Sequence, residues 1–155
     1  YWMHYLLYLI LTIYGTDIKA DDHIFKHEGT IIELMDAYFL AVDQKDIQGM
    51  LNFYDLPTIL HFNNRAPIEL NSEDEFKDVF NLWKESPKSL FNHTEQESIS
   101  VNEIRKNFIC VADVVYTRTN EMNQIISKGR SLYHFVYKNE NWKIYMIVNV
   151  EPDQE

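Results

Sequence analysis

Residues 30–62 read TIIELMDAYFLAVDQKDIQGMLNFYDLPTILHF, and this stretch decides the fold. Apolar side chains recur at helical spacing through its first half, from Ile31 to Tyr38 and beyond. This periodicity predicts a helix that begins at Thr30, because Thr30 and Glu33 have the spacing of a capping box. Everything that follows in the chain is expected to pack against this helix.

The second half of the stretch predicts a short helix and then a strand. Asp46 is a suitable N-cap, and proline at position 57 ends the helix because it lacks a backbone N–H group. The apolar stripe between them consists of Ile47, Met50, Leu51 and Tyr54. Residues 58–62 are β-branched and aromatic and predict a strand, which a tight turn at Asn63-Asn64 connects to a second strand over 66–70.

The remaining sequence predicts one more helix and then strands alone. Ser72 and Glu75 form a second capping box, and Ser86-Pro87 end the helix that they begin. Strands are predicted over residues 90–101, 108–118, 125–137 and 142–150, with short turns between them. Helices segregated from strands indicate an α+β fold, in which three N-terminal helices cover one face of a curved antiparallel sheet.

Composition limits the classes of function. The 155 residues are enough for one domain with a substantial core, and the aromatic content of 14% suits an aromatic-lined cavity. The net charge of −10 would repel a phosphate backbone, so no nucleic acid partner is expected. The one cysteine, Cys110, lies in an apolar strand and is predicted to be a buried, inert thiol.

The first 29 residues are set apart from the domain, which we assign to residues 30–155. Residues 1–14, YWMHYLLYLILTIY, are apolar but too few to span a membrane, and residues 15–29 are a polar connector. Two interpretations stay open, a targeting remnant or an extra element packed on the domain. The cytoplasm is the preferred location, and a secreted or periplasmic one applies if residues 1–20 are a signal segment. No membrane role is expected for the domain itself.

Three segments resemble a known superfamily. They are AYFLAVDQKDIQGMLNFY, SEDEFKDVFNLW and YHFVYKNENWKIYMIV, at residues 37–54, 72–83 and 133–148. They resemble the cone-shaped, cystatin-like fold of nuclear transport factor two, ketosteroid isomerase and the SnoaL-like polyketide cyclases, across about residues 30–152. The resemblance implies a sheet and helices that enclose a pocket. The relatives that the chain resembles most are of unknown function.

The isomerase branch of this superfamily implies a site when its residues are transferred by position. Its oxyanion-binding tyrosine falls on Tyr38, its second oxyanion donor on Tyr133 and its acidic base on His61. This chain departs from that pattern, since His61 replaces a carboxylate base and Tyr133 replaces a carboxylic acid. Imidazole titrates near neutral pH, so His61 is still chemically suited to act as the base.

Two functional hypotheses follow. The preferred one is a pocket protein that binds a small hydrophobic molecule, with His61 in a structural role. The alternative is a cofactor-free isomerase, cyclase or dehydratase in which His61 is the base and Tyr38 and Tyr133 hold the oxyanion. Further residues expected to contact a ligand are Tyr54, Trp83, Tyr116 and Arg118. The sequence contains no phosphate-binding loop, nucleophile elbow or metal-ligand cluster, so neither a cofactor nor a metal is expected.

The far face of the sheet is expected to form a homodimer contact, as the resemblance implies. Asp113 alternates with Val111 and Val115 and is predicted to lie on this face, away from the helices. There it is expected to pair with a cation such as Arg130.

Overall fold

The computed structural model describes residues 25–62 and 65–150. Residues 1–24 of the predicted N-terminal segment and the predicted turn at Asn63-Asn64 therefore lie outside the described residues, whereas residues 28–29, predicted as part of the connector, belong to the first helix. The elements, in chain order, are α2 (Glu28–Asp43), α3 (Ile47–Leu51), β1 (Tyr54–His61), β2 (Ile68–Leu70), α4 (Glu73–Lys84), the 3-10 helix η1 (Pro87–Ser89), β3 (His93–Arg105), β4 (Ile109–Thr119), β5 (Ile125–Lys138) and β6 (Asn141–Val150).

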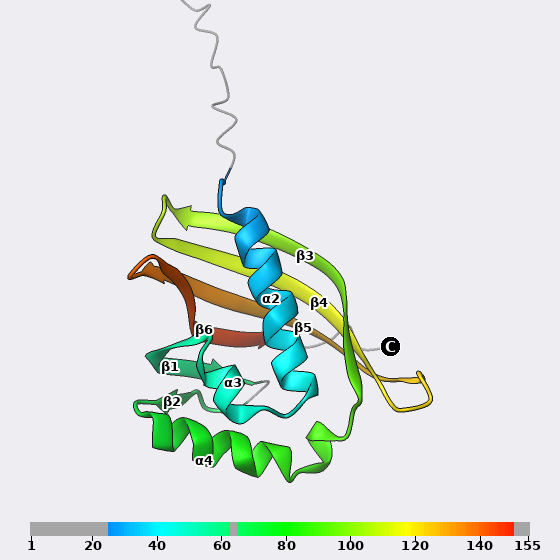
Figure 1. Cartoon of the computed structure of the whole chain (residues 1–155). Helices are drawn as coiled ribbons and strands as arrows, with labels where there is room; N and C mark the ends of the chain where they lie inside the picture. The colour runs from blue at the N-terminus through cyan, green and yellow to red at the C-terminus, as the bar shows by residue number, and fades with distance from the viewer. Residues whose placement is uncertain (1–24, 63–64, 151–155) are drawn as a thin grey trace, which may run out of the picture.

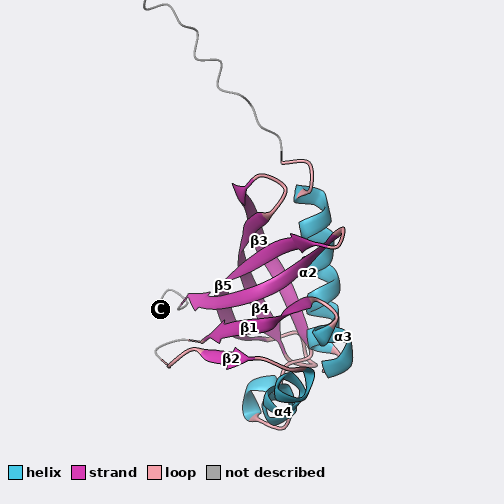
Figure 2. Cartoon of the chain, turned by 90° about the vertical axis from the view of Figure 1, so that its left-hand side faces the viewer, coloured by secondary structure: helices cyan, strands magenta, loops and turns pink. Residues whose placement is uncertain are grey.

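One curved sheet of six strands forms the frame of the molecule. The strand order is β2-β1-β6-β5-β4-β3, and every neighbouring pair is antiparallel except β1 and β6, which are parallel. Helix α2 crosses one face of the sheet, while α3 and α4 lie at the end formed by β1 and β2 (Figure 1). In the view from the side, α2 and α3 lie on one side of the strands and α4 lies below β2 (Figure 2). The predicted α+β fold is confirmed.

The apolar stripe of the first helix is confirmed, but its predicted start is wrong. Helix α2 begins at Glu28, and its N-cap, His27, makes no side-chain capping bond. Thr30 therefore lies inside the first turn, where its hydroxyl cannot serve as the N-cap. The two later caps are confirmed, because the side chains of Asp46 and Ser72 accept bonds from the backbone N–H groups three residues on.

The predicted second helix is too long. Helix α3 ends at Leu51, and Tyr54 is the first residue of β1, where its backbone pairs with Ile144. Pro57 lies inside this strand instead of ending a helix. The β1–β6 register shifts between Tyr54 and Ile59, and such an irregularity admits a proline that cannot donate to the ladder.

The four long strands are confirmed with small changes at their ends. Strand β3 starts at His93, three residues after the predicted start, because Leu90 follows directly on η1. The same strand extends to Arg105, so the predicted turn over 103–107 is shorter than expected. The turn between β5 and β6 contains Asn139 and Glu140 at positive φ, a conformation that asparagine tolerates well.

Strand alternation separates the sheet into an inner face toward α2 and an outer face. Cys110 and Tyr116 of β4 lie on the inner face and are buried, and burial raises the pKa of the Cys110 thiol to about 12. Asp113 lies on the outer face, where its carboxylate accepts two bonds from Arg130, at 2.9 Å and 2.7 Å. The buried inert thiol and the Asp113–Arg130 pair are both confirmed.

Candidate functional site

Three tyrosines from three elements meet inside the molecule. Tyr38 comes from α2, Tyr54 from β1 and Tyr133 from β5, and each is at most 6% exposed. The hydroxyls of Tyr38 and Tyr54 lie 2.6 Å apart and share a hydrogen bond. The rings of Tyr38 and Tyr133 are in edge contact at 5.8 Å. The structure therefore brings together two of the three predicted catalytic residues and one predicted ligand contact.

Burial fixes the protonation state of these hydroxyls. It raises the pKa of Tyr38 to about 12, although the bond from Tyr54 acts in the opposite direction. Burial likewise raises the pKa of Tyr54 and of Tyr133 well above the usual value for tyrosine. The three phenols are consequently neutral at physiological pH. Within the Tyr38–Tyr54 pair, one hydroxyl donates its proton to the oxygen of the other. The second hydroxyl proton of the pair is left to donate to another acceptor.

His61 does not join this group. Leu60, its neighbour in β1, is fully buried on the inner face and pairs with Ile147 of β6. His61 pairs with Val148, and Val148 pairs with Leu132 of β5, which precedes the inward-facing Tyr133. Because successive side chains of a strand point to opposite faces, His61 lies on the outer face. The expected convergence of His61 with the two tyrosines is therefore wrong.

Arg118 provides a positive charge at the end of the aromatic group. It follows the inward-facing Tyr116 by two residues in β4, and its guanidinium carbon lies 4.1 Å from the ring centroid of Phe91 and 5.1 Å from that of Tyr116. Its positive charge opposes the rise in the pKa of both Tyr38 and Tyr133. Arg118 thus faces the same interior as the tyrosines.

The Arg118 guanidinium has no acidic partner among residues 25–62 and 65–150. Its Nε atom is buried and makes no hydrogen bond within the same ranges. Buried polar atoms in folded proteins almost always have a partner, and a guanidinium is adapted to bind carboxylates with two parallel bonds. Arg118 therefore has the chemistry of an anion-binding residue with a free position.

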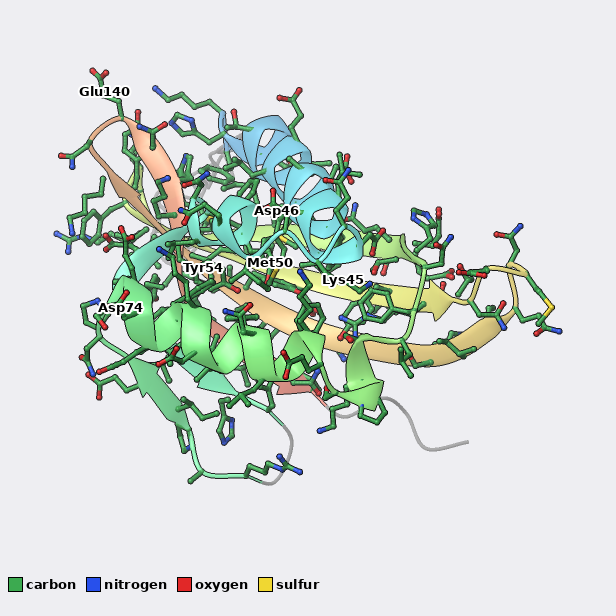
Figure 3. The ribbon with its side chains drawn as sticks, turned by 60° about the horizontal axis from the view of Figure 1, so that its bottom comes forward. Lys45, Asp46, Met50, Tyr54, Asp74 and Glu140 are labelled. Atoms are coloured by element: carbon green, nitrogen blue, oxygen red, sulfur yellow. The ribbon has the colours of Figure 1, made fainter. Side chains whose placement is uncertain are left out.

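Lys45 places a second cation on the same aromatic ring. Its Nζ lies 3.7 Å from the centroid of Phe91 and donates to the carbonyl oxygens of Phe91 and Asp43, at 2.8 Å and 3.1 Å. Partial burial lowers its pKa, the Asp43 charge raises it, and the positive charge of Arg118 lowers it further. Figure 3 shows Lys45 in the connection after α2. We call Arg118, Lys45 and Phe91 the cation cluster.

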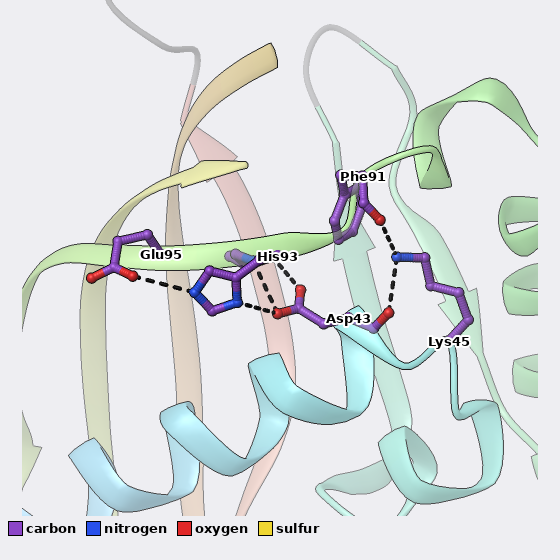
Figure 4. Close-up of polar contacts among 6 residues, drawn as sticks. Asp43, Lys45, Phe91, His93 and Glu95 are labelled. Atoms are coloured by element: carbon purple, nitrogen blue, oxygen red, sulfur yellow. Dashed lines mark hydrogen bonds and ion pairs between the residues drawn. The ribbon is translucent and has the colours of Figure 1, made fainter. Parts of the chain in front are cut away.

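A network of hydrogen bonds fixes the position of this cluster. The Asp43 carboxylate, 9% exposed, accepts bonds from the backbone and hydroxyl of Thr94 at 2.9 Å and 2.6 Å, and it lies 3.0 Å from a ring nitrogen of His93 (Figure 4). These contacts attach the end of α2 to the start of β3. Asp43 is thereby occupied at β3 and makes no ion pair with Arg118, while its carbonyl positions Lys45.

Gln96 adds an unpaired acceptor next to the cluster. Its backbone pairs with Tyr116, and residues opposite each other in a ladder share a face, so Gln96 faces the interior. Its amide oxygen is buried and has no hydrogen-bond partner in the described part of the chain. Trp83 of α4 completes the surroundings through its contact with Phe91 at 6.2 Å. An unpaired donor and an unpaired acceptor therefore lie on adjacent strands.

The sequence indicated part of this site and missed the rest. Tyr116, Arg118 and Trp83 were expected to contact a ligand; in the structure Arg118 and Trp83 contact Phe91, and Tyr116 contacts Arg118. The sequence did not single out Lys45, and Phe91 lay inside the strand predicted over residues 90–101. No local pattern connects two residues that are 46 positions apart. The positive φ of Lys45 marks a tight turn, but only the three-dimensional structure shows that the Lys45 side chain reaches Phe91.

Within 25–62 and 65–150, no three histidine, cysteine, aspartate or glutamate side chains gather where they could hold a metal ion. None of the helices that the structure describes has both the length and the apolar character needed to span a membrane.

Comparisons with solved structures identify the fold. A domain of unknown function with a cystatin-like fold from Nostoc punctiforme superposes with a TM-score of 0.67 at 12% identity, over 82% of this chain and 78% of that one. An NTF2-like protein of unknown function from Pseudomonas putida gives 0.64 at 13% identity, over 81% and 86%. A putative calcium/calmodulin-dependent protein kinase II association domain from Xanthomonas campestris gives 0.60 at 12%, over 81% and 88%.

The sequence comparisons agree with the structural ones. No curated protein matches the chain. The family model of the SnoaL-like domain matches residues 31–148, which include the tyrosine group and the cation cluster. The chain therefore belongs to the SnoaL-like domain family, within the nuclear-transport-factor-two-like fold.

Proposed function

We propose that this protein binds a small molecule with an apolar body and an anionic head group, and that Arg118 holds the head group. The observation that carries this proposal is the half-buried guanidinium of Arg118, which has a buried Nε without a partner and no carboxylate within reach among the described residues. The class of ligand expected from the sequence, a small hydrophobic molecule, is thereby restricted to hydrophobic carboxylates.

Electrostatics favour an anion at this position. Two cations, Arg118 and Lys45, lie against the single ring of Phe91 and repel each other. Partial burial weakens the screening of that repulsion by water. A carboxylate bound to the guanidinium of Arg118 would accept charge-assisted bonds and offset part of this repulsion. The negative charge of the whole chain does not oppose this, because the local field at the site is positive.

The neighbouring side chains suit an apolar ligand body. Trp83 is in ring contact with Phe91, and the ring of Tyr116 is in contact with the Arg118 guanidinium. The neutral hydroxyls of Tyr38 and Tyr133 face the same interior, and Gln96 offers an amide oxygen to a donor on the ligand. Apolar walls with a few converging polar groups are characteristic of small-molecule sites.

We favour the binding proposal over the catalytic alternative. Neutral tyrosine hydroxyls close to a cation are suited to hold an oxyanion, as the isomerase-like hypothesis requires. That hypothesis also requires a base, and no described contact joins a carboxylate or imidazole to the three tyrosines. His61 lies on the outer face of the sheet and does not supply that base, so His61→Ala is expected to leave turnover of any accepted substrate unchanged.

The homodimer through the sheet is a further proposal. Half-buried aliphatic side chains, among them Val115, Leu132 and Val148, lie on the outer face of the sheet. A second copy would cover them and leave the tyrosine group on the inner face undisturbed. Light scattering after gel filtration is expected to give twice the chain mass of 18.6 kDa, and a monomer at all concentrations would contradict the proposal.

The binding proposal is tested by calorimetric titration with hexanoate, octanoate and 3-phenylpropionate. Arg118→Met is expected to raise the Kd for the best of them by about tenfold or more, the usual effect of losing a charge-assisted hydrogen bond. The matched control is Arg65→Met, because Arg65 is exposed and lies in the connection between β1 and β2. Equal affinity in both variants, or no binding to the unmodified chain, would overturn the proposal.

A further inference from the structure

A pocket of about 360 Å³ lies at the other end of α2, next to the β5–β6 hairpin. Its walls come from the start of α2, the residues after α3 and the hairpin itself. Helix α2 has 16 residues, and an α-helix rises by about 1.5 Å per residue, so its ends are roughly 24 Å apart. The cation cluster lies at the C-terminal end, and this pocket is separate from it.

Aromatic side chains form one wall of the pocket. The ring of His27 lies 5.4 Å from that of Tyr137 and 5.6 Å from that of Trp142, and the last two rings are 5.1 Å apart. Phe53 and Leu34 add further apolar surface. Aromatic rings offer flat faces and edges to a planar ligand, so the wall suits an aromatic guest.

The indole nitrogen of Trp142 identifies what the guest must present. Trp142 is 4% exposed and lines the pocket, yet its Nε1 is buried and has no hydrogen-bond partner among the described residues. An indole N–H is a donor and never an acceptor. A buried tryptophan N–H usually has a partner, so a ligand that satisfies this one must supply an acceptor oxygen.

The charges around the pocket favour a negative acceptor. Helix α2 begins here without a side-chain cap, and the N-terminus of a helix carries partial positive charge. The Nζ of Lys143 donates to the carbonyl oxygen of Asn52, which keeps an ammonium group at the wall. Glu140 is the one acid among the lining residues described, and it points away from the fold at the tip of the hairpin (Figure 3).

From the pocket, the unpaired indole and the positive surroundings, we infer that this is a second ligand site, for a small aromatic carboxylate. One carboxylate oxygen accepts from Nε1 of Trp142, and the aromatic ring of the ligand packs against His27 and Tyr137. The volume is at the small end of the range for ligand pockets, roughly 300–1,000 Å³. This site does not depend on the function proposed for Arg118.

Titration of the full chain with phenylacetate tests the inference, with the indole N–H of Trp142 followed by NMR. A saturable shift of that signal is expected. Trp142→Phe keeps an aromatic ring, removes the donor and is expected to raise the Kd by about tenfold. The shift is expected to persist in Arg118→Met. Arg118, in β4, lies near the C-terminal end of α2, whereas this pocket lies at the N-terminal end.

Three outcomes would overturn the inference. They are no shift of the Trp142 signal at millimolar phenylacetate, unchanged affinity in Trp142→Phe, and loss of the shift in Arg118→Met. Leu34→Phe provides a second test if Trp142→Phe does not fold. It narrows the pocket and leaves the indole in place, so binding must weaken while the signal of Trp142 remains.

Discussion

Arg118 and Arg130 lie on neighbouring strands of one sheet, yet their surroundings are opposite. Arg130, on the outer face, makes a two-bond ion pair with Asp113. Arg118, on the inner face, has two aromatic rings and a lysine as neighbours and no acid among the described residues. The first arginine is satisfied by the fold itself, whereas the second is held in place without an anion.

This difference distinguishes a structural charge from a charge available for binding. An exposed ion pair adds little stability, and its partner is already supplied by the chain. A half-buried cation without a partner lowers stability, because its desolvation is not offset. Several hydrogen bonds of Asp43 nonetheless position the region around Arg118 and Lys45 (Figure 4). Such an arrangement is reasonable if the missing partner is a ligand.

The largest effect is expected from Asp43→Ala. This change removes the acceptor for two bonds from Thr94 and the contact with His93, and it detaches the end of α2 from β3. The free energy of unfolding is expected to fall by about 3 kcal/mol, since bonds to a charged acceptor are stronger than neutral ones. Urea denaturation measures it. A loss below about 0.5 kcal/mol, the usual limit for a surface change, would show that the network does not hold the inner cation cluster.

A smaller loss is expected from Tyr54→Phe. The 2.6 Å bond between two buried hydroxyls disappears, and the hydroxyl of Tyr38 loses its described partner. We expect a loss of about 1–2 kcal/mol in the free energy of unfolding. Tyr145→Phe, which changes a half-buried phenol elsewhere, serves as the control. If the two variants are equally stable, the tyrosine pair contributes nothing special to the interior next to Arg118.

The outer pair is expected to matter less and to depend on pH. Hydrogen bonding from Arg130 lowers the pKa of Asp113 below 3.8, so the pair stabilises the fold above the unfolded pKa and loses this effect as pH falls through the folded one. Asp113→Asn is therefore expected to cost about 0.5–1 kcal/mol at pH 7 and less at pH 2. A cost that is the same at both pH values would show that the charge of Asp113 is unimportant.

The smallest effect on stability is expected at Arg118. Arg118→Met removes a cation that lacks an acidic partner and keeps most of the packing against Phe91. Stability is expected to change by less than about 0.5 kcal/mol, or to increase, because the unpaired charge is lost. Thermal denaturation without ligand is the measurement. A loss above about 2 kcal/mol would mean that Arg118 has a structural partner after all, and the contrast with Arg130 would disappear.

Much of the fold was predictable, because its signals are local. The stripe from Ile31 to Tyr38, the cap at Ser72 and the alternation around Asp113 each depend on residues a few positions apart. Tyr54 was misassigned because it matches helical spacing from Ile47 as well as it matches a strand. Its place in β1 depends on pairing with Ile144, which is 90 positions away and invisible to local periodicity.

The site was predictable only in part. Tyr38 was correctly expected to face the interior, since it continues the apolar stripe of its helix. His61 was assigned to the wrong face of the sheet. The buried residues Thr58 and Leu60 alternate with it, which indicates that His61 points to the opposite face. Two features depend on how distant segments pack: among the described residues no acid lies near Arg118, and Lys45 and Phe91 meet at one place. No pattern within any one segment contains that information.

The most direct test of the account is the NMR signal of the Arg118 side-chain Nε–H group during titration with octanoate. The account predicts that this signal shifts and saturates with ligand, while the corresponding signal of Arg130 stays unchanged because its partner is Asp113. Binding of octanoate that leaves the Arg118 signal unmoved, or that moves the Arg130 signal instead, would contradict the central claim that Arg118 is the anion-binding residue.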